Sequence, residues 1–219
     1  MSRPTGGSRC GLIVLIAWTL VIFAPIDDQA RADLAGHEST GRFPHSIAVA
    51  DFNGDRHLDL AIAASAERKV TVLLGDGKGG VIRNTSYSVG RGPTWVTAGD
   101  LDGDGHPDLA TADTGAMGVT VLFNDGRGNF SRQQTVKGLK APVSAVIREH
   151  TRNGLKDLAV LDTLMSQLVL FQGMGGGALR QVGTYPVGKS PHILAEVDLN
   201  RDRLPDLIAT SLGQHTITV

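Results

Sequence analysis

The chain has 219 residues and a formal net charge of −1, a balance that gives no sign of a nucleic-acid partner. Its hydrophobic content of 41% is that of an ordinary globular protein. The 28 glycines and the low aromatic content of 5% favour short strands joined by many tight turns.

The first residues have the pattern of a secretory signal peptide. Arg3 and Arg9 precede an apolar run over residues 11–25, and Ala30-Arg31-Ala32 supplies the small residues that signal peptidase requires. The run is shorter than the roughly 18 to 20 residues that cross a bilayer, which favours cleavage after Ala32 over an uncleaved anchor. We therefore predict a signal peptide at residues 1–32 and a secreted chain, extracellular or periplasmic.

The rest of the sequence is built from a repeat of 49 residues without insertion or deletion. Three markers keep this step: a proline, an Asp-Leu pair and an apolar residue. The prolines are Pro44, Pro93, Pro142 and Pro191; the pairs begin at Asp59, Asp108, Asp157 and Asp206; the apolar residues are Val70, Val119, Leu168 and Ile217. The copies cover about residues 41–89, 90–138, 139–187 and 188–219, the last one incomplete.

Each copy has the pattern of short strands. In the first copy, residues 46–50, 60–63 and 70–74 are apolar runs, the glycine-rich residues 75–80 indicate a hairpin turn, and a weaker fourth strand is expected near 86–89. Four strands in about 50 residues are typical of a propeller blade. The predicted fold is all-β, a β-propeller of four-stranded blades.

An acidic loop between the first two strands recurs in copies one, two and four. Oxygen-bearing side chains stand at loop positions 1, 3, 5 and 9, and position 7 offers its backbone carbonyl. The predicted metal ligands are Asp51, Asn53, Asp55, His57 and Asp59; Asp100, Asp102, Asp104, His106 and Asp108; and Asp198, Asn200, Asp202, Leu204 and Asp206, with His57, His106 and Leu204 acting through the carbonyl.

Calcium is the cation that this pattern favours. It takes six to eight oxygens at about 2.3–2.6 Å, and a curled loop can point alternate carboxylates inward. Ten of the 22 acidic residues lie in these three loops, where they repel one another unless a cation neutralises them. An EF-hand is excluded because position 12 of the first loop is Ile62 and no helix flanks it. Asx turns without an ion are the alternative.

The residue at loop position 6 differs between the copies. Gly105 stands there in copy two, whereas Arg56 and Arg203 are expected to strain the turn and to lower the affinity. Copy three has lost the pattern, with Glu149, Thr151, Asn153 and Asp157 at the ligand positions and basic residues between them, and we predict no metal there.

These features resemble the FG-GAP/VCBS repeat family, whose members form β-propellers like the N-terminal head of integrin α subunits. The matching residues are the lead-in at residues 44–48, the aspartate loops, and the Gly-Asp-Gly-Lys-Gly turn at 75–79. The resemblance covers essentially all of residues 41–219. It implies that the loop aspartates bind calcium and that the protein serves extracellular recognition or adhesion, a role that the family often plays beside catalytic domains and rarely combines with chemistry of its own.

The function predicted is therefore a secreted calcium-binding module for adhesion, binding or scaffolding, not an enzyme, with a protein or glycan as its extracellular ligand. Residues 183–190 match the phosphate-binding G-x4-G-K-S string, but Pro191 and a strand follow where a helix would be needed, so no nucleotide is expected. A non-functional fragment of a longer repeat protein and an accessory domain of a carbohydrate-active or lyase-type enzyme remain alternatives.

The ring is the open question of the fold. Four copies are fewer than the seven or so blades of integrin-like propellers, so we expect an incomplete or truncated ring. Residues 33–42 align with a fourth strand and could complete the last blade. Two chains could also combine into one larger ring, which would make the protein a homo-oligomer.

Overall fold

The computed structural model describes residues 38–202 and 205–219, and these fold into an all-β structure. The predicted signal peptide, residues 1–32, lies outside the described residues. The strands are β1 (Pro44–Ala50), β2 (Asp59–Ala64), β3 (Lys69–Gly75), β4 (Val81–Ser88), β5 (Pro93–Gly99), β6 (Asp108–Asp113), β7 (Gly118–Phe123), β8 (Arg132–Val136), β9 (Pro142–Arg148), β10 (Asp157–Asp162), β11 (Gln167–Gly173), β12 (Leu179–Pro186), β13 (Pro191–Val197), β14 (Asp206–Ser211) and β15 (Thr216–Thr218).

The strands form four antiparallel sheets, each made of consecutive strands, which we call blades 1 to 4. Blades 1, 2 and 3 comprise β1–β4, β5–β8 and β9–β12, and blade 4 comprises β13–β15. The only helical segment in the described residues is a single 3₁₀ turn, η1 (Thr114–Ala116). The prediction of four-stranded propeller blades is thus confirmed for three sheets, and the last sheet has three strands.

The sequence repeat sets the strand boundaries. The repeat prolines begin β1, β5, β9 and β13, each of which is the first strand of its blade and lies at an edge of the sheet. A proline has no N–H for a strand ladder, so it is tolerated at the first residue of an edge strand. The repeat Asp-Leu pairs begin the second strands, and this fixes the loop between the first and second strands at one length.

The apolar core lies between successive blades, in three clusters. One joins blades 1 and 2, with Phe52, Val72 and Leu109 among its buried side chains. The next joins blades 2 and 3, and the last joins blades 3 and 4. Both faces of β6 and β10 are buried, which explains why apolar side chains stand at adjacent positions, such as Leu109 and Ala110, instead of alternating with polar ones.

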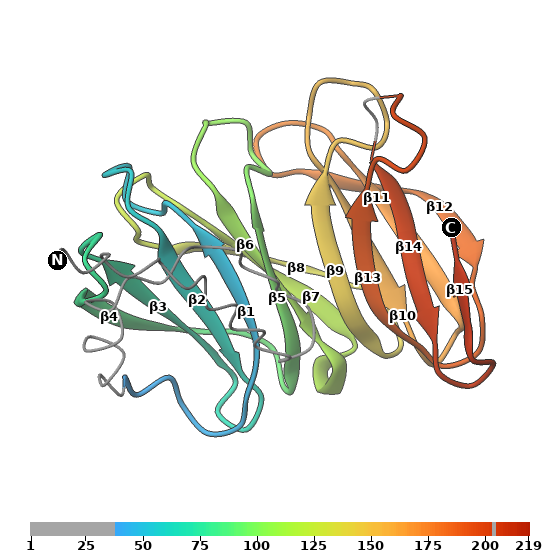
Figure 1. Ribbon diagram of the computed structural model, residues 1–219, viewed down its shortest axis with the longest axis horizontal. Coiled ribbons are helices and arrows are strands. Elements are labelled where there is room, and N and C mark those ends of the chain that lie inside the picture. Colours follow the sequence, from blue (N-terminus) through green and yellow to red (C-terminus); the bar gives the residue numbers. More distant parts are fainter. Residues whose placement is uncertain (1–37, 203–204) are drawn as a thin grey trace, which may run out of the picture.

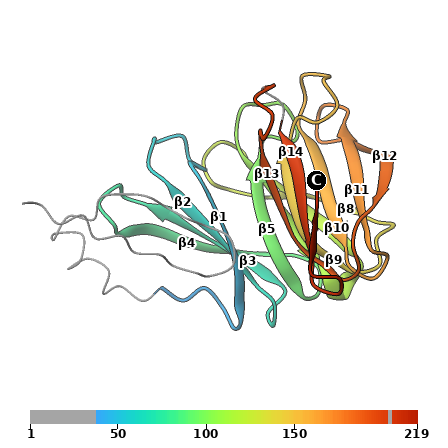
Figure 2. The same cartoon turned by 45° about the vertical axis from the view of Figure 1, so that its right-hand side comes forward.

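The blades fan out along an arc in chain order (Figures 1 and 2). Their first strands, β1, β5, β9 and β13, contact one another in sequence. Over the residues that the structure describes, the arc does not close into a ring. Residues 38–42 lie against blade 1, where the Thr71 hydroxyl donates to the Thr40 carbonyl at 3.1 Å. They do not form a fourth strand beside β15.

The fourth strand of the first blade differs from its prediction. It covers Val81–Ser88 rather than residues near 86–89. The turn before it is tight: the Asp76 carboxylate accepts the N–H groups of Lys78 and Gly80, so pairing resumes at Val81 opposite Gly75. Side chains of β4 alternate between exposed and half-buried positions, and a polar outer strand gives only a weak apolar pattern.

Candidate metal centre

The acidic loops join the first and second strands of each blade. Figure 1 shows these four loops along the upper rim of the arc, all on the same side of the molecule. The repeat explains this placement, because blades in the same register present equivalent loops on the same rim. We number the loops by their blades, so that loops 1 to 4 are residues 51–59, 100–108, 149–157 and 198–206.

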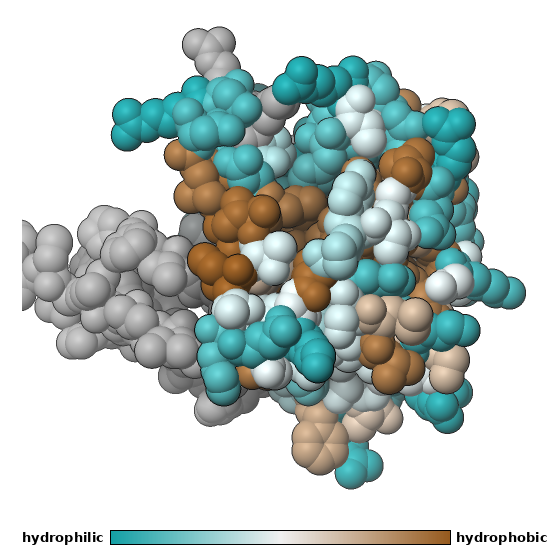
Figure 3. Space-filling view, turned by 90° about the vertical axis from the view of Figure 1, so that its right-hand side faces the viewer, coloured by the Kyte–Doolittle hydropathy of each residue, from teal (hydrophilic) through white to brown (hydrophobic). Residues whose placement is uncertain are grey.

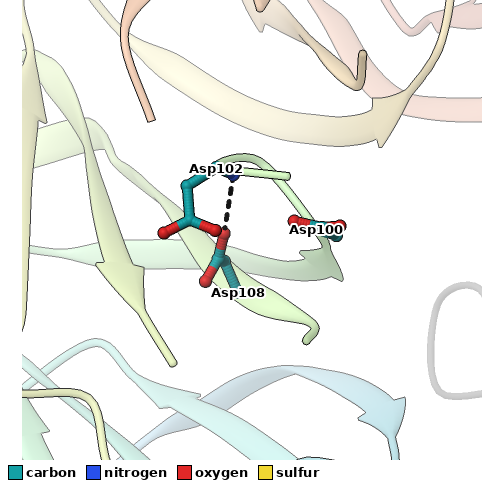
Figure 4. A group of neighbouring side chains, drawn as sticks. All are labelled: Asp100, Asp102 and Asp108. Atoms are coloured by element: carbon teal, nitrogen blue, oxygen red, sulfur yellow. Dashed lines mark hydrogen bonds between the residues drawn. The ribbon is translucent and has the colours of Figure 1, made fainter. Parts of the chain in front are cut away.

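Loop 2 brings together the largest set of predicted ligands. Carboxylate oxygens of Asp100, Asp102 and Asp108 all lie within 4.8 Å of one another, and Figure 4 shows them around one side of the curled loop. The loop is held by its own backbone: Asp100 accepts the N–H groups of Gly103 at 2.7 Å and Gly105 at 2.9 Å. The loop's own backbone hydrogen bonds therefore hold the curl.

This oxygen set fits calcium. Two oxygens that bind the same ion at about 2.3–2.6 Å lie at most about 5 Å apart, so a separation of up to 4.8 Å allows one ion to reach all three. The donors are hard carboxylates, which suit calcium better than zinc or copper. Asp104 and the carbonyl of His106 follow on the same loop and complete the predicted ligand set, although these two do not belong to the converged carboxylate group.

The electrostatics of loop 2 also favour a cation. Burial raises the pKa of Asp108 from 3.8 to about 6, with the charges of Asp102 and Asp104 adding to the rise. Burial likewise raises the pKa of Asp102. Several carboxylates that share a small volume resist ionisation together, and a bound cation would reverse this effect.

Loop 1 repeats the arrangement with weaker features. Asp51 accepts the N–H groups of Gly54 at 2.7 Å and Arg56 at 2.7 Å, as Asp100 does in loop 2. Arg56 has a φ of +70°, which confirms that position 6 needs the left-handed conformation that glycine adopts most readily. The amide of Asn53 donates to Asp55 at 2.8 Å, so these two ligand candidates pair with each other.

The histidines at position 7 explain a second feature of the repeat. The His57 ring lies against Gly77, and the His106 ring against Gly126, so closely that an added Cβ on either glycine would be within 2.5 Å of the ring. Both glycines belong to the turns after the third strands. The side chains therefore pack on these turns, and only their backbone carbonyls remain candidates for the ion.

Loop 4 follows the pattern as far as the structure describes it. Asp202 N–H bonds to the side chains of Asp198 at 3.1 Å and Asn200 at 2.9 Å, and Asp206 accepts the Leu199 N–H at 2.9 Å. Leu204, the predicted carbonyl ligand, and Arg203 at position 6 lie outside the described residues. Four of the five predicted ligands of this loop, all but Leu204, therefore lie in the described residues.

Loop 3 shows what the fold does without the acidic pattern. Asp157 accepts the N–H groups of His150 and Thr151 at 2.7 Å and of Gly173 at 2.9 Å, and the Thr151 hydroxyl at 3.2 Å. Asp108 binds the equivalent backbone groups in loop 2, Leu101 at 2.9 Å and Asn124 at 2.9 Å. The aspartate at position 9 therefore ties the loop to the end of the third strand in both blades, a role that the sequence pattern alone assigned to metal binding.

Arg132 is a residue of the site that sequence reasoning missed. From β8 its guanidinium pairs with the Asp102 carboxylate, stacks 3.6 Å from the centre of the Phe123 ring and donates to the Gly176 carbonyl of blade 3. The Gly176 N–H in turn donates to the Asp102 carbonyl at 3.0 Å. Loop 2 is thus held against the next blade, and a positive charge already lies beside one of its ligands.

Comparison with known proteins supports this architecture. Residues 51–111 match the family model described as FG-GAP-like repeat, which confirms the predicted resemblance over loops 1 and 2. No curated protein sequence matches the chain. In the described residues, no helix is long and apolar enough to cross a membrane.

Solved structures with the same fold are distant in sequence. BBS1N in complex with ARL6DN has a TM-score of 0.55 at 13% identity, over 85% of this chain and 57% of that one. An auxiliary nutrient binding protein from Bacteroides ovatus has a TM-score of 0.57 at 10% identity, over 80% and 47%. An Agrocybe aegerita lectin that recognises non-reducing terminal N-acetylglucosamine has 0.52 at 23%, over 74% and 45%. The chain spans about half the length of each, and these likenesses concern the fold.

Proposed function

We propose that this protein is a secreted, calcium-stabilised repeat module that binds an extracellular protein or glycan. The observation that carries the proposal is the convergence of three carboxylates within 4.8 Å in loop 2, on a loop whose backbone is already curled around them. Equivalent side chains in loops 1 and 4 extend the pattern along one rim. The signal-peptide pattern of residues 1–32 supports secretion.

Calcium in these loops is structural. A bound ion would neutralise the clustered carboxylates and add its binding free energy to folding stability. Hydrogen bonds within the chain hold the loop in place: the aspartate at position 1 accepts the N–H groups of positions 4 and 6, and the aspartate at position 9 ties the loop to the third strand. Loop 3 makes the last connection without an acidic cluster, so the ion would add stability to blades 1, 2 and 4 and not to blade 3.

The proposed binding role rests on the contacts of the loop carboxylates and on the solved structures that share this fold. The loop carboxylates are committed to one another and to backbone groups, which leaves them unsuited to acid–base catalysis, so we propose a binding module rather than an enzyme. Among proteins with this fold, one is a lectin and another a nutrient binding protein. Ligand recognition by loops on a propeller rim is the simplest function that agrees with both.

Thermal unfolding with calcium and with EDTA tests the structural role. Replacing the position-1 aspartates together, as Asp51→Asn, Asp100→Asn and Asp198→Asn, should abolish the increase in Tm that calcium gives. The control is Glu149→Gln, the same position in loop 3, which should keep the increase. An identical Tm of the wild type in calcium and in EDTA would refute the proposal. A glycan array probed in both conditions then tests for a ligand.

A further inference from the structure

We propose that the rim opposite the acidic loops docks on an anionic lipid surface, with apolar side chains of two turns entering the bilayer interface and basic residues facing the headgroups. The inference does not depend on calcium and goes beyond the proposed function. It concerns the connections between strands that we call the lower rim, which Figure 1 shows along the lower side of the molecule. They are residues 65–68, 89–92, 114–117, 137–141, 163–166, 187–190 and 212–215.

Two turns of the lower rim carry large apolar side chains, although turns favour small and polar residues. In the turn between β10 and β11, Leu164 is 70% exposed and Met165 is 50% exposed. In the equivalent turn between β6 and β7, Met117 is 58% exposed. These turns belong to blades 2 and 3, each of which has a blade on either side. Seen from the end of the arc, the lower edge carries apolar as well as hydrophilic side chains (Figure 3).

The two apolar turns are attached to the same stretch of chain between blades 2 and 3. The Thr114 hydroxyl donates to the Pro142 carbonyl at 2.5 Å, and the Thr163 N–H donates to the Ala141 carbonyl at 3.0 Å. The apolar side chains therefore stand at the tips of two neighbouring turns that are fixed to each other. Projecting apolar side chains of this kind suit insertion among lipid headgroups better than enclosure of a small molecule.

A basic residue recurs beside these turns at the 49-residue step of the repeat. It stands two positions before each repeat proline, as Arg42, Arg91, Lys140 and Lys189. Three of these four residues belong to the lower rim as defined above, and the first precedes β1 on the same side of blade 1. The repeat thus supplies one positive charge per blade to this rim.

Hydrogen bonds place this basic residue next to the turn of its blade. The Arg91 Nε donates to the Gly115 carbonyl at 3.1 Å, which brings the guanidinium to the apolar turn of blade 2. In blade 3, the N–H groups of Lys140 and Met165 donate to the same Asp162 carboxylate, at 2.6 Å and 3.2 Å. A basic residue therefore accompanies each of the two apolar turns.

The lower rim as a whole is positively charged. Its connections contain five basic residues, which are Arg68, Arg91, Lys137, Lys140 and Lys189. Their one acidic residue is Glu67, which pairs with Lys69 at 2.8 Å. The carboxylates of Asp113 and Asp162, at the ends of β6 and β10, are buried and accept backbone N–H groups of the rim. An anionic surface would attract this rim and repel the acidic loops on the other.

The combination of basic and apolar side chains favours a bilayer over a soluble acidic partner. Binding at a membrane interface draws on buried apolar area and on attraction to anionic headgroups together. A soluble polyanion would engage the basic residues and leave Leu164 and Met165 in water. Attachment through the lower rim would also direct the acidic loops away from the bilayer.

Sedimentation with lipid vesicles tests the proposal. The chain should bind vesicles of phosphatidylglycerol and phosphatidylcholine mixed in equal parts, and should not bind vesicles of phosphatidylcholine alone. Met165→Ser should weaken this binding about tenfold through lost apolar burial. Lys140→Gln should weaken it about fivefold through the loss of one positive charge near the surface.

The opposite rim offers matched controls. Met174 is also 50% exposed, but its turn, residues 174–178, contacts loop 2 through the Gly176 N–H and the Asp102 carbonyl. Met174→Ser, and Lys78→Gln in the turn at 76–80, should leave vesicle binding unchanged. A wild type that does not bind, or controls that weaken binding equally, would overturn the proposal. So would an effect of Lys140→Gln without one of Met165→Ser, which would indicate a soluble polyanion instead.

A fluorescent label tests which rim meets the bilayer. In a Cys10→Ser background, which removes the only cysteine of the sequence, Met165→Cys and Met174→Cys each carry an environment-sensitive dye. The anionic vesicles should increase the emission of the dye at residue 165 and shift it to the blue, with no change at residue 174. Attachment through residues 1–32 alone does not give this difference. No response at residue 165, or an equal response at both residues, would contradict docking by the lower rim.

Discussion

Asparagine substitutions of Asp108 and Asp157 would separate the structural role of position 9 from its role toward an ion. Both side chains are fully buried, and both accept backbone N–H groups from their loop and from the end of the third strand. Asparagine offers one acceptor oxygen and an NH₂ group, so at least one buried N–H loses its partner in each variant. We expect each substitution to lower the free energy of unfolding in EDTA by about 1–3 kcal/mol.

Calcium should distinguish the two variants. A site filled at 100 times its Kd adds about 2.7 kcal/mol to the free energy of unfolding. The wild type and Asp157→Asn should gain the same increment, whereas Asp108→Asn should gain less by up to this amount. The measurement is urea unfolding followed by circular dichroism, in EDTA and in calcium. Equal calcium increments for Asp108→Asn and Asp157→Asn would show that position 9 does not serve an ion.

Three further predictions concern loop 2 and its surroundings. Gly105 has a φ of +89° with open space around it, so Gly105→Ala should lower the free energy of unfolding in EDTA by about 1 kcal/mol through backbone strain alone. It should also weaken calcium binding in calorimetry. The control is Gly154→Ala, at φ +79° in loop 3, which should lower the free energy of unfolding as much and leave calcium binding unchanged. Arg132→Gln should tighten calcium binding several-fold, since breaking a partly exposed ion pair with Asp102 costs up to about 1 kcal/mol, and unchanged affinity would show that the pair does not compete with the ion. The folded-state pKa of Asp108 is raised from 3.8 to about 6, so its protonation stabilises the folded state below pH 4. In EDTA, the free energy of unfolding should therefore fall as the pH rises from 4 to 6. Added calcium, or Asp108→Asn, should make this fall smaller.

The repeat made most of the fold predictable. Copies without insertions share strand boundaries, and two of the three markers mark the start of a strand: the proline begins an edge strand, and the Asp-Leu pair begins the second strand. The bounds of β4 were harder to predict from the sequence, because its side chains alternate between exposed and half-buried positions without a strong apolar pattern. The side chains that meet between successive blades could not be predicted, since they depend on how blades pack rather than on any one copy.

The site was predictable as a set of loops but not in its contacts. Asp100 and Asp102 were found from spacing, because alternate residues of a curled loop point to the same side. The pairing of Arg132 with Asp102 joins residues 30 positions apart and exists only once two strands and the next blade are in place. A signal for the His106 packing was present in the sequence, namely a glycine twenty residues later in copies one and two, at Gly77 and Gly126.

Acidic loops 1, 2 and 4 are proposed to bind calcium, whereas loop 3 is not. Isothermal titration of calcium into the EDTA-treated and dialysed chain tests this difference most directly. We predict three calcium ions per chain, reduced to two by Asp100→Asn and unchanged by Glu149→Gln. A titration without binding heat, in a chain whose circular dichroism shows it to be folded, would contradict the proposal.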